Sequence, residues 1–87
     1  MYALTNTPTI NLEATGDNIR TMRRERGITV RDIAEHMGFT TEQPIYKWQR
    51  GDCLPTIDNL IILSRMFRCY VEDILVIDDD EMSSRCL

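Results

Sequence analysis

Side chains able to recognise nucleic acid gather within one short stretch, residues 42–50. Gln43 carries an amide that can hydrogen-bond adenine N6 and N7 together, and Lys47 can reach guanine O6 and N7 or a phosphate. In a helix, Ile45 and Trp48 share one apolar side, because they lie three positions apart. The other side carries Glu42, Gln43, Tyr46, Lys47 and Arg50. A helix with these two sides can rest on a protein core and insert into a DNA major groove.

Catalysis and metal binding need groups that this sequence does not bring together. His36 is the single histidine, and no cysteine or second histidine stands at ligand spacing from it. Cys53, Cys69 and Cys86 are an odd number at wide spacing, which fits neither a disulfide framework nor a zinc motif. No Ser/His/Asp set, Cys/His set, carboxylate pair or glycine-rich phosphate loop can be assembled. We therefore expect no enzyme activity, no metal site and no cofactor.

The residues just before this stretch predict a second short helix that supports it. Thr29 is suited to cap the N-terminus of that helix, and Asp32, three residues on, completes a capping pattern. An apolar stripe at helical spacing follows: Val30, Ile33, Ala34 and Met37. Gly38 can adopt the positive φ that ends the helix, and Thr40 and Thr41 can cap the next one. Two short helices joined by a glycine-led turn predict a helix-turn-helix.

Capping residues and apolar periodicity divide the rest of the chain into further elements. Thr15 and Thr56 are candidate N-caps, and Gly51 is a candidate helix end. The expected helices cover about residues 16–26, 30–37, 42–50, 57–67 and 71–75. The short runs 10–12 and 75–77 are suited to strands, so the two ends of the domain could pair. The expected core consists of Ile19, Met22, Ile28, Ile33, Ala34, Met37, Phe39, Ile45, Trp48, Leu54, Leu60, Ile61, Phe67 and Ile74.

Five short motifs follow one another along the chain: Asn18-Ile-Arg, Arg26-Gly-Ile-Thr, Asp32-Ile-Ala, Ile45-Tyr-Lys-Trp-Gln-Arg-Gly and Leu54-Pro-Thr-Ile-Asp-Asn-Leu. In this combination they resemble the lambda repressor/Cro-type (XRE) family, over about residues 15–75. The resemblance implies an all-α fold, a compact five-helix lambda-repressor-like DNA-binding domain, to which the terminal strand runs would be an addition. It also implies binding to double-stranded DNA as a homodimer.

The resemblance implies roles for individual side chains. Those expected to contact bases are Glu42, Gln43, Tyr46 and Lys47. Those expected to contact phosphates are Thr29, Arg31, Thr40, Thr41 and Arg50. Three positions depart from the family's common pattern. Val30 stands where a phosphate-clamping Gln is frequent, and Asp52 stands where a Lys is frequent. Gln49 replaces a Glu that commonly pairs with an arginine of the first helix, here Arg23, so that bond would be charged on one side only.

Net charge is −4, the wrong sign for a polyanionic partner, but its distribution is uneven. Residues 15–71 hold nine bases and seven acids, whereas the rest hold seven acids and only Arg85. We expect three segments: an extended N-terminal arm at 1–14, the helix-turn-helix domain at 15–77 and a flexible acidic tail at 78–87. No secretory signal and no apolar run of about 20 residues is present, so a cytoplasmic location without membrane association is expected.

Two functions stay open at this point. The first is a bacterial or phage-type transcriptional regulator, a repressor that reads a short operator with the helix at about 42–50. The second is a helix-turn-helix module that binds another protein, as an antitoxin does. Gln43, Lys47 and Arg50 favour DNA. The net charge, Val30 and Asp52 favour a protein partner.

Overall fold

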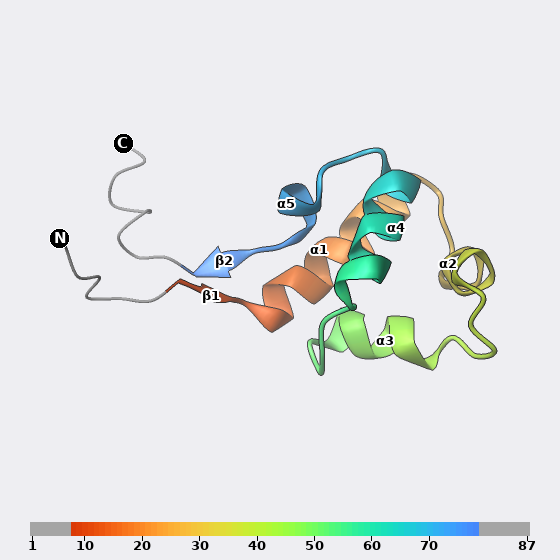
Figure 1. The fold of residues 1–87 in the computed structure, drawn as a ribbon, viewed down its shortest axis with the longest axis horizontal. Coiled ribbons are helices and arrows are strands. Elements are labelled where there is room, and N and C mark those ends of the chain that lie inside the picture. The colour runs from red at the N-terminus through yellow and green to blue at the C-terminus, as the bar shows by residue number, and fades with distance from the viewer. Residues whose placement is uncertain (1–7, 79–87) are drawn as a thin grey trace, which may run out of the picture.

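A computed structural model describes residues 8–78, which form five helices and a small sheet (Figure 1). The helices are α1 (Leu12–Glu25), α2 (Val30–Met37), α3 (Gln43–Arg50), α4 (Ile57–Phe67) and α5 (Val71–Ile74). The sheet is one antiparallel pair, β1 (Thr9–Ile10) with β2 (Ile77–Asp78). It brings the two ends of the described chain together beside α1 (Figure 1). The expected fold class, helical with a short terminal strand pair, is confirmed.

The helices meet around one apolar core. Its buried members are Ile19, Met22, Val30, Ile33, Ala34, Ile45, Trp48, Leu60, Leu63, Phe67 and Ile74. Phe39 packs edge-on against Trp48, with ring centroids 6.0 Å apart. Most of the expected core is therefore correct. Two expected members differ. Ile61 is 44% exposed, because its face of α4 points to solvent, and Leu54 is only partly buried and lies outside the core cluster, while Leu63 is fully buried.

Helix ends lie where local signals are strongest. The side chains of Thr29 and Thr56 accept hydrogen bonds from backbone N–H groups three residues on, and α2 and α4 begin immediately after them. Gly38 ends α2 with φ of 75°, a conformation that costs a glycine little. These boundaries match the prediction from sequence, because caps and left-handed glycines act over only a few residues.

The start of α1 differs from the prediction. The helix begins at Leu12, capped by Asn11, whose side-chain oxygen accepts from Ala14 N–H at 2.9 Å. Thr15 is buried instead of capping, and its hydroxyl accepts from Val76 N–H at 2.9 Å. Residues 12–14 are therefore helical and do not belong to an extended arm. At the other end, Asp78 belongs to β2 and not to a tail; residues 1–7 and 79–87 lie outside the described part.

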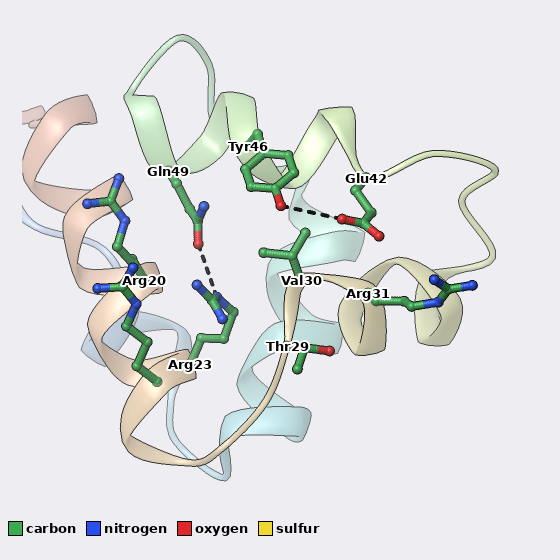
Figure 2. Close-up of a pocket in the computed structure, with 9 residues that line it drawn as sticks. Arg20, Arg23, Thr29, Val30, Arg31, Glu42, Tyr46 and Gln49 are labelled. Carbon is green, nitrogen blue, oxygen red and sulfur yellow. Dashed lines mark hydrogen bonds between the residues drawn. The ribbon is translucent and has the colours of Figure 1, made fainter.

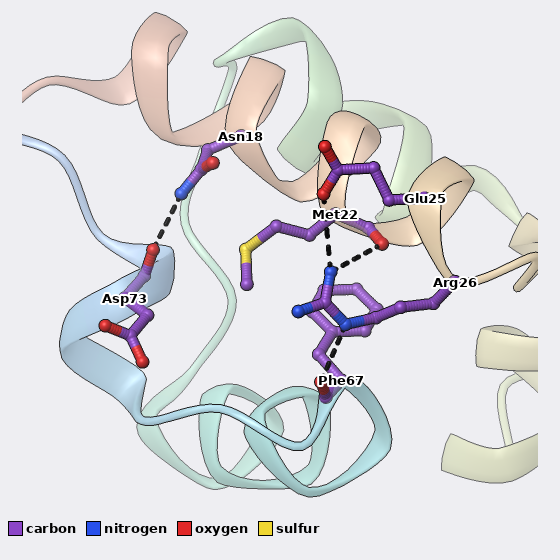
Figure 3. Close-up of polar contacts among 6 residues, drawn as sticks. All are labelled: Asn18, Met22, Glu25, Arg26, Phe67 and Asp73. Atoms are coloured by element: carbon purple, nitrogen blue, oxygen red, sulfur yellow. Dashed lines mark hydrogen bonds and ion pairs between the residues drawn. The ribbon is translucent and has the colours of Figure 1, made fainter.

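Side chains of α1 and of its C-cap residue, Arg26, also hold the ends of α4 and α5 (Figure 3). Asn18 Nδ2 donates to the carbonyls of Asp73 and Ile74 at 2.8 and 2.9 Å. Arg26 Nε donates to the Phe67 carbonyl at 2.7 Å, and its guanidinium lies 5.7 Å from the Phe67 ring centroid. Carbonyls in the last turn of a helix lack helical partners, so these bonds satisfy groups that would otherwise be unpaired. α1 and the residue that follows it thus hold the C-terminal ends of α4 and α5 in place.

Candidate nucleic-acid interface

Burial divides α3 into the two sides predicted from sequence. Ile45, Trp48 and Gln49 face the core and are at most 5% exposed. The exposed side of the helix carries Gln43, Tyr46, Lys47 and Arg50. The expectation that Trp48 is a core residue is confirmed. The outward side of α3 therefore offers an amide, a phenol and two cationic groups to solvent.

The N-terminus of α3 differs from the prediction. Its N-cap residue is Glu42, and no side chain caps it, so Thr40 and Thr41 are exposed turn residues and not caps. Pro44 lies in the first turn, where its missing N–H removes one donor that would have needed a partner. Glu42 instead lies one turn below Tyr46, whose hydroxyl makes a long contact with Glu42 Oε1 at 3.4 Å.

The N-terminus of α2 lies beside α3 and is held by a complete capping box. Thr29 Oγ1 accepts from Asp32 N–H at 3.0 Å, and Asp32 Oδ2 accepts from Thr29 N–H at 2.9 Å. Two hydrogen bonds lower the pKa of the Asp32 carboxyl. The larger effect comes from the backbone of Thr29 and the smaller from its side chain. The first-turn N–H groups of Val30 and Arg31 have no partner within the helix, a geometry suited to anions.

Two arginines expected to contact phosphates already pair with carboxylates. Arg31 Nε lies 3.3 Å from Glu35 Oε2, and Arg50 Nη2 lies 3.0 Å from Asp52 Oδ2. All four side chains are more than half exposed, so each pair is weak and can exchange its carboxylate for a phosphate at low cost. Asp52, which stands where the family often has Lys, thus compensates the charge of Arg50.

A basic hollow separates α1 from the N-termini of α2 and α3 (Figure 2). Its lining comprises Arg20, Arg23, Arg24, Thr29, Val30, Arg31, Glu42, Tyr46 and Gln49. Four of these, Thr29, Arg31, Glu42 and Tyr46, were expected from sequence to contact DNA. The arginines of α1 were not assigned to the site, although their spacing of three to four residues places them on one side of a helix.

At the buried side of this hollow, α1 and α3 are joined by a polar contact. Arg23 Nε donates to Gln49 Oε1 at 3.1 Å (Figure 2), and Arg23 Nη1 donates to the Ile28 carbonyl at 3.0 Å. The expected Arg23–Gln49 bond, charged on one side only, is therefore present. Val30 is 6% exposed, so its side chain belongs to the core and cannot clamp a phosphate.

Among residues 8–78, no helix is both long and apolar enough to cross a membrane, and no group of His, Cys, Asp and Glu is placed to hold a metal ion.

Comparison with known proteins agrees with this geometry. The sequence model of the family described as "Cro/C1-type HTH DNA-binding domain" matches residues 18–80. The crystal structure of the DNA-binding domain of BldD is similar, with a TM-score of 0.61 and 20% identity over 75% of this chain and 93% of that one. The clp gene regulator ClgR from C. glutamicum has a TM-score of 0.61 and 24% identity over 71% of this chain and 79% of that one. No curated protein sequence matches significantly.

Proposed function

The chain belongs to the family of Cro/C1-type helix-turn-helix DNA-binding domains, and we propose that this DNA-binding transcriptional regulator is a sequence-specific repressor. It would act in the cytoplasm by occupying promoter DNA. α3 would lie in the major groove, with Glu42, Gln43, Tyr46 and Lys47 facing the bases. Thr29, Arg31, Thr40, Thr41 and Arg50 would contact the flanking phosphates.

The observation that carries this proposal is the division of α3 by burial. Ile45 and Trp48 fix the helix to the core, while Gln43 and Lys47 are exposed one helical turn apart. The amide of Gln43 matches the donor and acceptor of adenine, and Lys47 matches the acceptors of guanine. A helix of eight residues that projects these groups is long enough to read a few base pairs.

A single α3 contacts few bases, so a short palindromic operator bound by a homodimer is the expected arrangement. Two copies related by a two-fold axis would place their α3 helices in successive major grooves, about 34 Å apart. The number of contacts between protein and DNA doubles in this arrangement. The increase compensates for the small excess of positive over negative charges in each domain.

Selection of bound sequences from random duplex DNA tests the proposal. Gln43→Ala and Lys47→Ala should each cost about 1–3 kcal/mol on the selected site and relax the preference at one base pair. Arg50→Ala should weaken all duplexes about equally, because phosphate contacts carry no sequence information. Arg65→Ala on α4 is the matched control, since it also removes one exposed positive charge. An unchanged preference in both α3 variants would show that another surface reads the bases.

A protein partner is the second candidate, and the exposed face of α4 favours it. Ile57 and Ile61 lie one turn apart and are 75% and 44% exposed, and Tyr70 nearby in sequence is 76% exposed. Exposed apolar groups that share a face are typical of protein-binding surfaces. Salt dependence separates the candidates, because DNA binding should weaken steeply with ionic strength whereas apolar association should not.

A further inference from the structure

The basic hollow between α1, α2 and α3 is, we propose, a binding site for one phosphate group. Its ligands are the side-chain amide of Gln49 and the guanidinium group of Arg23, and the other arginines of the lining, Arg20, Arg24 and Arg31, add positive charge. The phosphate is supplied by the DNA backbone or by a free phosphate ion, and the first source rests on the proposed function. The sequence pattern did not predict that Gln49 or the arginines of α1 bind a ligand.

Gln49 supplies the first argument. Its residue surface is only 5% exposed, and its Oε1 is occupied by the bond from Arg23. Because Arg23 can only donate, the oxygen must face it and the Nε2 group must point away. Among residues 8–78, Gln49 Nε2 donates no hydrogen bond, and the side chain lines the hollow (Figure 2). A buried amide donor without a partner costs free energy, so an acceptor in the hollow is favoured.

The charge of the lining supplies the second argument. Four arginines and one carboxylate, Glu42, line the hollow. Arg20 and Arg31 have exposed partners, Asp17 at 4.0 Å and Glu35 at 3.3 Å. Within the described residues, neither Arg23 nor Arg24 has a carboxylate within 4.0 Å. A Glu at position 49 would neutralise Arg23, whereas Gln49 orients the guanidinium and leaves its charge free for an anion.

The position of the hollow supplies the third argument. Its wall is continuous with Thr29 and Tyr46, which lie at the proposed DNA face, so a backbone phosphate near α3 could enter it. The volume of about 470 Å³ accommodates a phosphate with several waters. Val30 cannot supply the clamp that the family often has at the start of α2. Gln49, which lies on α3, would therefore supply the amide donor to the DNA backbone phosphate that Val30 of α2 cannot supply.

Free inorganic phosphate tests the site without DNA. Thermal midpoints of the wild type, Gln49→Glu and Arg65→Gln are compared in phosphate and in chloride of equal ionic strength. Phosphate at about ten times its dissociation constant should raise the wild-type midpoint by roughly 5 °C or more. Arg65→Gln changes the net charge by the same amount as Gln49→Glu but lies on α4, so it should retain this shift. Gln49→Glu should lose it, because a carboxylate would occupy the guanidinium and repel the anion.

DNA binding tests the other source of the phosphate. Gln49→Glu should weaken binding to the selected operator and to random duplex by the same factor, about tenfold or more. The slope of log affinity against log salt should fall by about 0.9, the value for one phosphate. The preferred base sequence should not change. Gln49→Met removes the amide without adding charge, so its smaller loss separates the missing donor from repulsion by the new carboxylate.

The outcomes separate the two sources. If Gln49→Glu loses the rise of the thermal midpoint in phosphate and also binds duplex DNA more weakly, while Arg65→Gln keeps the rise, a phosphate site that DNA occupies is supported. Protection by phosphate together with unaltered DNA binding overturns the DNA source and leaves a site for a free anion. Protection by phosphate in a protein that binds no duplex at all would refute the proposed function but not the site. Equal behaviour of wild type and Gln49→Glu in both assays would overturn the inference.

Discussion

The replacement Gly16→Ala tests how closely α1 and α3 are packed. A Cβ atom at position 16 would lie 2.3 Å from the Trp48 carbonyl oxygen and 2.6 Å from that of Gln49. Both contacts are with backbone, so a side-chain rotation cannot relieve them and α1 must move away from α3. Overpacking of this kind costs about 1–3 kcal/mol, and a clash with rigid backbone belongs at the upper end of that range.

Helix propensity acts in the opposite direction at this position. Ala is favoured over Gly in a helix interior by about 1 kcal/mol, so propensity alone would make Gly16→Ala stabilising. With a clash of about 3 kcal/mol, we expect a net loss of about 2 kcal/mol. For a domain of this size, that loss lowers the thermal midpoint by roughly 10 °C.

Thermal melting followed by circular dichroism measures this effect. Thr21→Ala is the matched control, because Thr21 is an exposed interior residue of the same helix and its replacement should be neutral or slightly stabilising. DNA affinity should also fall in Gly16→Ala, since the displaced α1 carries Arg23 away from α3. An unchanged or higher midpoint in Gly16→Ala would refute the close approach of the two helices.

Three further predictions concern other parts of the domain. Trp48→Ala should lower stability by about 3–5 kcal/mol in chemical denaturation, as loss of a buried aromatic does, and lost DNA affinity at unchanged stability would place Trp48 on the surface. Because the pKa of Asp32 is lower in the folded state than in the unfolded state, its stabilising effect is complete above its ordinary pKa and is lost as pH falls through the folded value. The midpoint of Asp32→Asn should therefore depend less on pH in acid than that of the wild type; parallel curves would contradict this. Removal of residues 79–87, which include Asp79, Asp80 and Glu81, should preserve the melting midpoint and tighten binding to random DNA at low salt, and a difference that persists at high salt would exclude a charge effect.

Local signals predicted the elements whose boundaries are set locally. α2 and α4 begin after Thr29 and Thr56, each of which bonds a backbone N–H three residues on. At the start of α1, however, Thr15 was predicted from sequence as the N-cap, whereas Asn11 caps the helix. Thr15 has a different role, because its hydroxyl accepts a hydrogen bond from the N–H of Val76, 61 residues away. A bond over this sequence distance leaves no local pattern, so the prediction placed the helix start too late.

The candidate site was predictable to the same extent. The apolar spacing of Ile45 and Trp48 indicated which side of α3 faces outward, and burial confirms it. The basic hollow was not predictable, because it exists only where α1 approaches α3. That approach requires a residue without a side chain at Gly16. It also buries Gln49, whose bond to Arg23 was expected from the family resemblance but whose burial was not.

The contacts of α1 with the C-terminal segment have a consequence for folding during synthesis. Asn11, Thr15 and Asn18 bond backbone groups of residues 73–76, so the first helix to be synthesised is completed by nearly the last described residues. Such contacts between distant parts of a chain slow folding, because a long loop must close before they form. While residues 73–76 are still within the ribosome, α1 lacks these partners and the core around Ile19 lacks Ile74. We therefore expect the nascent domain to stay open until this segment emerges and then to fold in one cooperative step.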